Sequence, residues 1–210
     1  MYTRCVLRPF QLSEDQKEKL LAAASNAPPT SPGLLTVADG LRGTLPRGFA
    51  HDLSRSLLGR GPQVFASARN AFQRWDQFDL GWVRVMNPTA HVALGELVAV
   101  EAHTACLWSA NVSRIDEVID GPTRFGFLYT TTVFHVEEGQ ERFVLDYDPV
   151  TEEVSYLLEA ISRPRHMLAR IGYPISRAMQ HRFARDSHAR MAISVSRRSA
   201  TPPTRDRDTS

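Results

Sequence analysis

The sequence predicts an α+β fold in which a curved antiparallel sheet of about seven strands wraps around a long C-terminal helix, preceded by an N-terminal helical arm. Strand-like runs follow one another between short turns from 78 to 161, which favours antiparallel pairing of sequence neighbours. One strand and one helix precede these runs, and a helical segment follows them. A single core of this kind fits a chain of 210 residues that is 42% hydrophobic and 23% charged.

Composition divides the chain into three parts. We expect a helix and an irregular arm over 1–48, the main domain over 49–192, and a disordered tail over 193–210. Cys5 and Cys106 lie far apart without CxxC spacing, which indicates a reducing compartment. The sequence shows no signal-peptide run and no stretch of ~20 apolar residues, so we expect a cytoplasmic protein without a transmembrane segment.

Local signals mark the first helix and the arm. Ser13 and Gln16 have the spacing of a capping box, and the helix that they begin should end near Ser25. Proline and glycine are frequent from 26 to 48, which is typical of an irregular segment.

A strand over 49–58 should lead into a second helix. Gly59, Arg60 and Gly61 break the strand, and Pro62 suits the first position of the helix. Apolar residues at helical spacing predict that one face of this helix is buried. These residues are Val64, Phe65, Ala68, Phe72 and Trp75.

Six further strands are predicted over 78–86, 91–101, 105–118, 123–135, 140–147 and 153–161. Because side chains alternate along a strand, Glu141 shares a face with Phe143, and Glu159 lies on the face opposite Tyr156. Glu101 and Glu159 are charges within apolar strands, so they are either on a solvated outer face or buried with a partner. Of these two alternatives we favour the solvated face.

The C-terminal helix follows the turn Ser162-Arg163-Pro164. Pro174 should either kink this helix or start a second and longer one. Residues at helical spacing predict its core-facing stripe. They are Leu168, Ile171, Ile175, Ala178, Met179 and Phe183.

The predicted sheet is wider than the helix that has to cover it. Seven strands ~4.8 Å apart form a face about 30 Å wide, whereas a helix with its side chains is ~10–12 Å across. The sheet must therefore curl, and the space inside is either filled by side chains or left open as a pocket.

Four stretches resemble a known family. They are LPRGFAHDLSRSLLGRGPQVFASARNAFQRW, FDLGWV, RFGFLYTTTVFHVEEGQERF and SRPRHMLARIGYPISRAMQHRFARDS, and together they span most of residues 10–191. By these stretches the chain resembles the domain of unknown function 1990 family of uncharacterised bacterial and plant proteins, which implies no activity. The order of elements resembles the helix-grip fold of the lipid-transfer and polyketide-cyclase superfamily, whose members hold apolar ligands between sheet and C-terminal helix.

The leading hypothesis is a protein that holds an apolar or amphipathic small molecule between the sheet and the C-terminal helix. Large apolar walls would supply the affinity, and a few polar groups would set the orientation. The residues predicted to bind this molecule are Trp82, Trp108, Phe125, Phe127, Tyr129, Phe143, Tyr156 and Arg163. The alternative that the strand aromatics simply fill the core stays open.

Two other hypotheses stay open as well. An enzyme of cyclase, hydratase or hydrolase type would use His135, Glu141 or Glu159 as acid–base groups. An interaction protein would act through the arginine-rich C-terminal helix, with weak contact to an anionic membrane, since 163–210 carries 11 arginines against three aspartates. The sequence shows no metal-ligand spacing and no cofactor or nucleic-acid-binding motif, so we expect none of these partners.

Overall fold

The predicted strands pair into one strongly curled antiparallel sheet. The computed structural model describes residues 7–31, 33–104, 106–164 and 173–199. The strand order is β4-β10-β9-β8-β7-β6-β5, and β1 pairs with β7 beside this path. The strands of this sheet are β1 (Leu7–Arg8), β4 (Ala50–Arg60), β5 (Val83–Val85), β6 (Leu97–Thr104), β7 (Leu107–Asp120), β8 (Arg124–Thr131), β9 (Glu137–Tyr147) and β10 (Glu153–Pro164).

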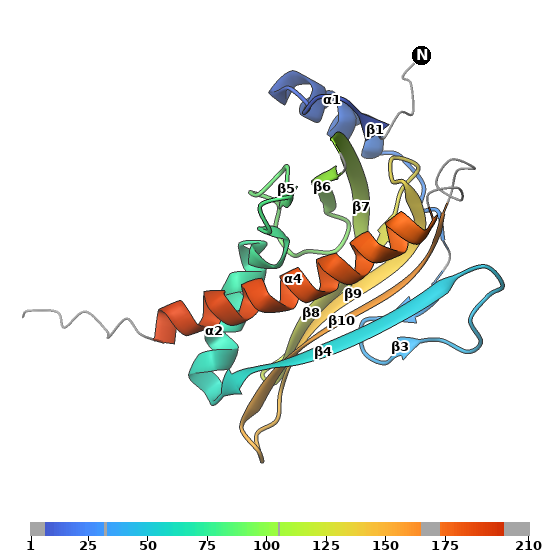
Figure 1. Cartoon of the computed structure of the whole chain (residues 1–210). Helices are drawn as coiled ribbons and strands as arrows, with labels where there is room; N and C mark the ends of the chain where they lie inside the picture. The colour runs from blue at the N-terminus through green and yellow to red at the C-terminus, as the bar shows by residue number, and fades with distance from the viewer. Residues whose placement is uncertain (1–6, 32, 105, 165–172, 200–210) are drawn as a thin grey trace, which may run out of the picture.

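Helices lie on both sides of the sheet. Within the described residues they are α1 (Glu14–Ala24), α2 (Pro62–Gln73), the 3-10 helix η1 (Asp76–Phe78) and α4 (Tyr173–Ser199). Figure 1 shows α4 running along the hollow of the sheet, with α2 beside its C-terminal half. The predicted fold class, a curved antiparallel sheet around a long C-terminal helix, is confirmed.

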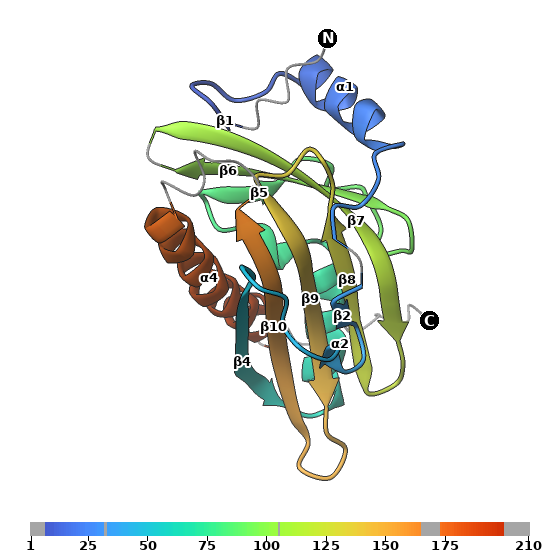
Figure 2. The same cartoon turned by 90° about the vertical axis from the view of Figure 1, so that its right-hand side faces the viewer.

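Local irregularities allow the sheet to curl. The register shifts after Ile115 in β7 and after Val154 in β10, and bulges of this kind bend strands. Gly139 in β9 lies so close to β10 that a Cβ atom on it would overlap the carbonyl oxygen of Ile161. Glycine is therefore required where these two strands approach each other. Figure 2 shows the resulting curvature of the strands.

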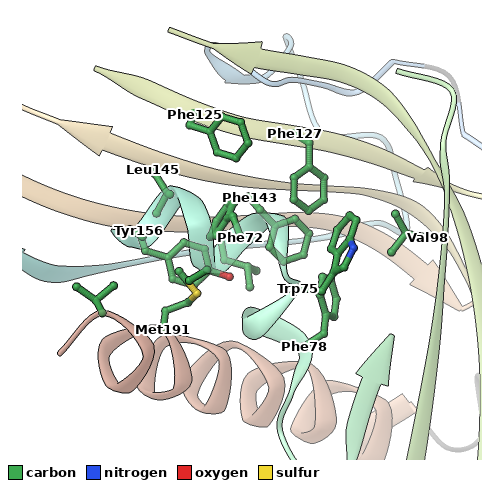
Figure 3. Close-up of a cluster of buried hydrophobic side chains, with 14 of the residues drawn as sticks. Phe72, Trp75, Phe78, Val98, Phe125, Phe127, Phe143, Leu145, Tyr156 and Met191 are labelled. Atoms are coloured by element: carbon green, nitrogen blue, oxygen red, sulfur yellow. The ribbon is translucent and has the colours of Figure 1, made fainter. Parts of the chain in front are cut away.

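One half of the hollow is a solid apolar core. Helix α2 begins at Pro62, as predicted, and buries its apolar face. The ring of Phe72 in α2 lies 5.4 Å from that of Tyr156 and 6.1 Å from that of Phe127, both from strands. Figure 3 shows the strand aromatics meeting α2 and Met191 of α4. Side chains of α2 and of the C-terminal half of α4 pack against the strand aromatics in this part of the described structure.

The N-terminal segment covers the convex face of the sheet. Helix α1, which has the predicted capping box at Ser13, packs Ala24 against Ala99 and Val112 of β6 and β7. The arm that follows forms a two-stranded sheet of β2 (Leu35–Thr36) and β3 (Gly40–Leu41). Leu35 is fully buried there against apolar residues of β8, β9 and β10. Figure 2 shows the arm crossing these strands.

Three of the six predicted strands are shorter than expected. The run 123–135 forms β8 only as far as Thr131. The run 78–86 contributes only β5, because η1 ends at Phe78 and the chain then turns through Gly81, whose φ is +78°. The run 91–101 contributes to β6 only from Leu97 onward. Apolar composition alone did not distinguish these connecting segments from strands.

Helix α4 is described from Tyr173, so Pro174 stands in the first described turn. The choice between a kink and a new helix start depends on residues 165–172, which lie outside the described residues. Of the predicted core-facing stripe, Phe183 packs against the core. Ala178 is exposed, so the assignment of Ala178 to this stripe is wrong. The predicted stripe residues that lie outside the described residues are Leu168 and Ile171.

The predicted tail is partly helical. Helix α4 continues to Ser199, so the disorder expected for residues 193–199 is wrong. Met191 and Val195 are buried, which explains why the helix extends this far. Residues 200–210 lie outside the described residues.

Candidate functional site

A cavity of about 830 Å³ lies between the concave face of the sheet and the N-terminal half of α4. Because α2 and the aromatic core close the other half of the hollow, the cavity extends toward β5, β6 and β7. Its apolar walls are formed by Phe78, Val83, Val100, Ala102, Leu158, Met179 and Phe183. The volume falls in the range of ~300–1,000 Å³ that is typical of small-molecule sites.

Polar side chains gather in the cavity near the connection between β8 and β9. Tyr129 and Glu141 are register partners, and the Tyr129 hydroxyl donates a hydrogen bond of 2.7 Å to Oε2 of Glu141. Burial raises the pKa of Glu141 to about 7; the Tyr129 hydrogen bond opposes this rise, and the charges of Glu137 and Asp52 add to it. Glu141 therefore exists both with and without its proton near neutral pH.

His135 faces the same cavity as a neutral imidazole. Burial lowers the pKa of His135 to about 4. The backbone N–H of Glu137 donates to Nδ1 of His135 at 3.0 Å, so Nδ1 is an acceptor and the proton of the neutral ring lies on Nε2. The ring is thus an N–H donor without charge at neutral pH.

A hydrogen-bonded network joins the beginning of α4 to the sheet. Arg177 forms a bidentate ion pair with Asp52 of β4, with Nη2 2.6 Å from Oδ1, and this hydrogen bonding lowers the pKa of Asp52. Arg177 also donates to Oε1 of Gln180 at 2.7 Å. Nε2 of Gln180 in turn donates to Oε2 of Glu137 at 2.6 Å. The carboxylates of Asp52 and Glu137 thereby hold α4 over the cavity.

A second histidine fixes α4 to the edge strand. His188 lies between two serines of β4, with Nε2 2.8 Å from Oγ of Ser54 and Nδ1 2.7 Å from Oγ of Ser56. Burial lowers the pKa of His188, so the ring is neutral and accepts from one serine while it donates to the other. This arrangement satisfies both ring nitrogens within the protein.

Eight predicted site residues, four of them at the cavity, fall on the concave side of the sheet. Those that line the cavity are Trp82, Tyr129, His135 and Glu141. Those that are packed in the core shown in Figure 3 are Phe125, Phe127, Phe143 and Tyr156. Because α2 occupies the space in front of these four, they do not line this cavity.

Two other predicted binding residues lie on the convex face. Trp108 stacks on His103 with a ring distance of 4.5 Å, and its neighbours Leu107 and Ser109 are the residues of β7 that face the cavity. Nε of Arg163 donates to Oε1 of Glu138 at 2.7 Å, on the face opposite the cavity. Neither Trp108 nor Arg163 is therefore placed to touch a molecule in the cavity.

Glu159 lies on the convex face too, and it is buried. It is 3% exposed, Nε of Arg142 donates to its Oε2 at 2.5 Å, and Nε2 of His51 lies 2.7 Å from its Oε1. Glu101 is 2% exposed and pairs with Arg84 at 2.9 Å. The prediction that both glutamates lie on a solvated face is wrong, because the N-terminal segment covers that face. Glu159 is therefore no longer a candidate acid–base group of the cavity.

Sequence reasoning missed Asp52 and Gln180. Strand 49–58 carries polar residues at alternate positions, and Asp52 and Ser54 from this series line the cavity. That alternation was a usable signal for a polar inner face at β4. Gln180 gave no comparable signal, since its position depends on how α4 is rotated against the sheet.

Family membership follows from the match between this chain and a family model. The model described as domain of unknown function (DUF1990) matches residues 35–190, which is more than half of the chain. The chain belongs to this family. The resemblance expected from the sequence is thus confirmed, and it extends across the sheet, α2 and most of α4.

Relatives of this DUF1990 protein occur in distant organisms. A UPF0548 protein of Dictyostelium discoideum is 32% identical over an alignment of 158 residues, and the match covers 70% of this chain and 73% of that protein. A UPF0548 protein of Arabidopsis thaliana is 30% identical over an alignment of 146 residues, and the match covers 67% of this chain and 70% of that protein.

Two solved structures are similar to this chain at low sequence identity. The crystal structure of TTHA0849 from Thermus thermophilus has a TM-score of 0.52 at 9% identity, covering 72% of this chain and 100% of that one. The crystal structure of the ZhuI aromatase/cyclase from Streptomyces sp. R1128 has a TM-score of 0.49 at 14% identity, covering 72% and 96%. The likeness to the Thermus protein concerns the fold alone.

Among the described residues, four arginines of α4 form ion pairs with aspartates of the same chain. The pairs are Arg177 with Asp52, Arg182 and Arg185 with Asp186, and Arg190 with Asp79. These pairs neutralise much of the positive charge on which an interaction through this helix would depend.

The described part of the chain holds neither a metal-ligand cluster nor a helix that could span a membrane. There, no three His, Cys, Asp or Glu side chains come together as a metal site requires. No helix among those residues has both the length and the apolar character needed to cross a bilayer.

Proposed function

We propose that this member of the DUF1990 family binds an apolar or amphipathic small molecule in the cavity beneath α4. The observation that carries the proposal is a cavity of about 830 Å³ with apolar walls and with polar groups gathered near one connection of the sheet. Apolar ligand surface buried there would contribute ~25 cal/mol per Å², and the polar groups would orient the molecule.

Native mass spectrometry of the protein purified from its source tests this proposal. We expect a bound small molecule that organic solvent extracts. Matched variants locate it: Ala160→Phe places a ring in the cavity, whereas Ala178→Phe adds the same ring to the exposed face of α4. The ligand should be lost from the first variant and kept by the second. An empty wild-type protein that also fails to bind hydrophobic probe dyes would refute the proposal.

A second candidate function is an enzyme of cyclase, hydratase or hydrolase type. The observation that favours it is a carboxyl with a pKa of about 7, Glu141, in the same cavity as the neutral His135. A group whose pKa lies near the working pH can both accept and donate a proton efficiently. Glu141 would exchange protons with the substrate, and His135 would donate a hydrogen bond to it.

A metabolite extract provides the test of this second candidate. Wild type and Glu141→Gln are each incubated with the extract, and the mass spectra are compared over time. An enzyme predicts a substrate–product pair that changes with wild type and not with the variant. Unchanged spectra with a ligand still bound would leave binding as the function and reject the enzyme.

A further inference from the structure

Glu141 differs from the other carboxylates that line the cavity. Asp52 is held by Arg177, and Glu137 accepts a hydrogen bond from Gln180. Within the described part of the chain, Tyr129 is the residue that donates a hydrogen bond to Glu141, and no Lys, Arg or His there forms an ion pair with it. A buried carboxylate with a single neutral donor is costly unless a further partner stabilises it.

A molecule in the cavity is in a position to be this further partner. Glu141 is surrounded by protein, yet it retains some accessible surface, and it lines the cavity. The charges that act on it, those of Glu137 and Asp52, are both negative. The electrostatic environment at this point of the cavity therefore favours a cation.

We propose that the ligand of this cavity carries a protonated amine, bound by the carboxylate of Glu141 and the hydroxyl oxygen of Tyr129, with its apolar part against Val100 and Phe183. The inference rests on the proposed binding function and specifies the polar end of the ligand. An ammonium group donates to both oxygens, and a charge-assisted hydrogen bond is about twice as strong as a neutral one. In this arrangement the ammonium supplies the counter-charge that Glu141 lacks.

The same site should reject carboxylates. A ligand carboxylate beside Glu141 would place a third negative charge near Glu137 in a low-dielectric cavity, where like charges repel strongly. A neutral alcohol would bind with intermediate affinity, since it can donate one hydrogen bond to Glu141. The formal net charge of the chain is +2, so general attraction of cations to the protein would not produce this order.

Three probes with the same tail test the inference: decylamine, decan-1-ol and decanoate, titrated by isothermal calorimetry at pH 8. At this pH decylamine is protonated and Glu141 is mostly ionised. We expect decylamine to bind about tenfold or more tightly than decan-1-ol, the range given by one charge-assisted hydrogen bond, and decanoate to bind most weakly.

Two variants assign the preference to Glu141. In Glu141→Gln, decylamine should lose its advantage while the Kd of decan-1-ol changes by less than about threefold, because only the charge is removed. Glu153→Gln removes an exposed carboxylate that pairs with Arg60 outside the cavity, and it should keep the wild-type order. If Glu141→Gln does not fold, Tyr129→Phe replaces it and should weaken decylamine more than decan-1-ol.

The outcomes separate the inference from the proposed function. Equal binding of all three probes, or tightest binding of decanoate, would overturn the inference and leave small-molecule binding intact. Binding of no probe to the wild-type protein would overturn both. A decylamine preference that persists in Glu141→Gln would also overturn the inference, because the cation would then be held elsewhere.

Discussion

Replacing Glu141 with glutamine should change how the stability of the protein depends on pH. Burial raises the pKa of Glu141 from 4.5 to about 7, so the folded state binds this proton more tightly than the unfolded state does. The stabilising contribution of the protonated carboxyl is fully present below pH 4.5 and is lost as the pH rises through about 7. Glutamine does not titrate, so the variant lacks this loss.

The size of the effect follows from the two pKa values. At ~1.4 kcal/mol per pKa unit, the interval between 4.5 and about 7 corresponds to about 3 kcal/mol. This is a large part of the ~5–15 kcal/mol by which a domain is usually stable. Glutamine also weakens the hydrogen bond from Tyr129, at a cost of ~0.5–1.5 kcal/mol. This bond favours the ionised carboxyl, and its effect on the pH dependence is already contained in the pKa of about 7.

Urea denaturation of both proteins between pH 4.5 and pH 8 measures the effect. The free energy of unfolding of Glu141→Gln, relative to wild type, should increase by about 3 kcal/mol across this range. His135, whose pKa burial lowers to about 4, destabilises both proteins as the pH falls from 6.5, so its contribution largely cancels in the comparison. Glu153→Gln is the control and should parallel wild type. Equal pH dependence of Glu141→Gln and wild type would refute the reasoning.

Two further predictions concern the convex face. Gly40→Ala puts a Cβ atom 2.5 Å from Oε2 of Glu159 and 2.8 Å from Nη2 of Arg142, so it should lower the free energy of unfolding by about 3 kcal/mol or more. Gly43 also has a positive φ, but a Cβ atom there would have no atom within 4 Å, so Gly43→Ala should cost about 1 kcal/mol. Urea denaturation of the two variants gives the difference, and equal costs would show that the arm does not depend on this contact. Glu159→Gln should cost about 3–5 kcal/mol because Arg142 stays buried without a carboxylate, against less than about 1 kcal/mol for Glu153→Gln at the surface. A thermal melt of Glu159→Gln that matches wild type would contradict this.

Much of the fold was predictable because it depends on local chemistry. The capping box at Ser13 and the helix start at Pro62 are set by hydrogen bonds and dihedral preferences of a few residues. Alternation along β9 and β10 correctly put Glu141 with Phe143 and separated Tyr156 from Glu159. These features require no knowledge of distant parts of the chain.

The candidate site was predicted less well because it depends on distant contacts. Alternation shows which residues share a face, but not which half of that face a helix covers. Phe127 and Tyr129 share a face of β8, yet α2 packs on the first and the cavity reaches the second. The burial of Glu159 likewise depends on the arm around Gly40, more than one hundred residues earlier in the chain.

Glu141 and Glu159 show how the sheet separates two kinds of buried carboxylate. They stand on neighbouring strands, where Glu141 is the register partner of Ala160 and Glu159 is that of Arg142. Arg142 directly follows Glu141 in the chain, but alternation turns its guanidinium to the convex face, where it satisfies Glu159.

The concave face offers Glu141 no positively charged register partner of the kind that Glu159 has in Arg142. Its register partners on that face are Ala160 on one side and Tyr129 on the other, and neither carries a positive charge. The strands that satisfy Glu159 therefore give Glu141 no positively charged register partner, and a cation in the cavity would stabilise its charge. This asymmetry supports a cationic ligand more strongly than the size of the cavity does, because an apolar cavity without Glu141 would accept any molecule of suitable shape.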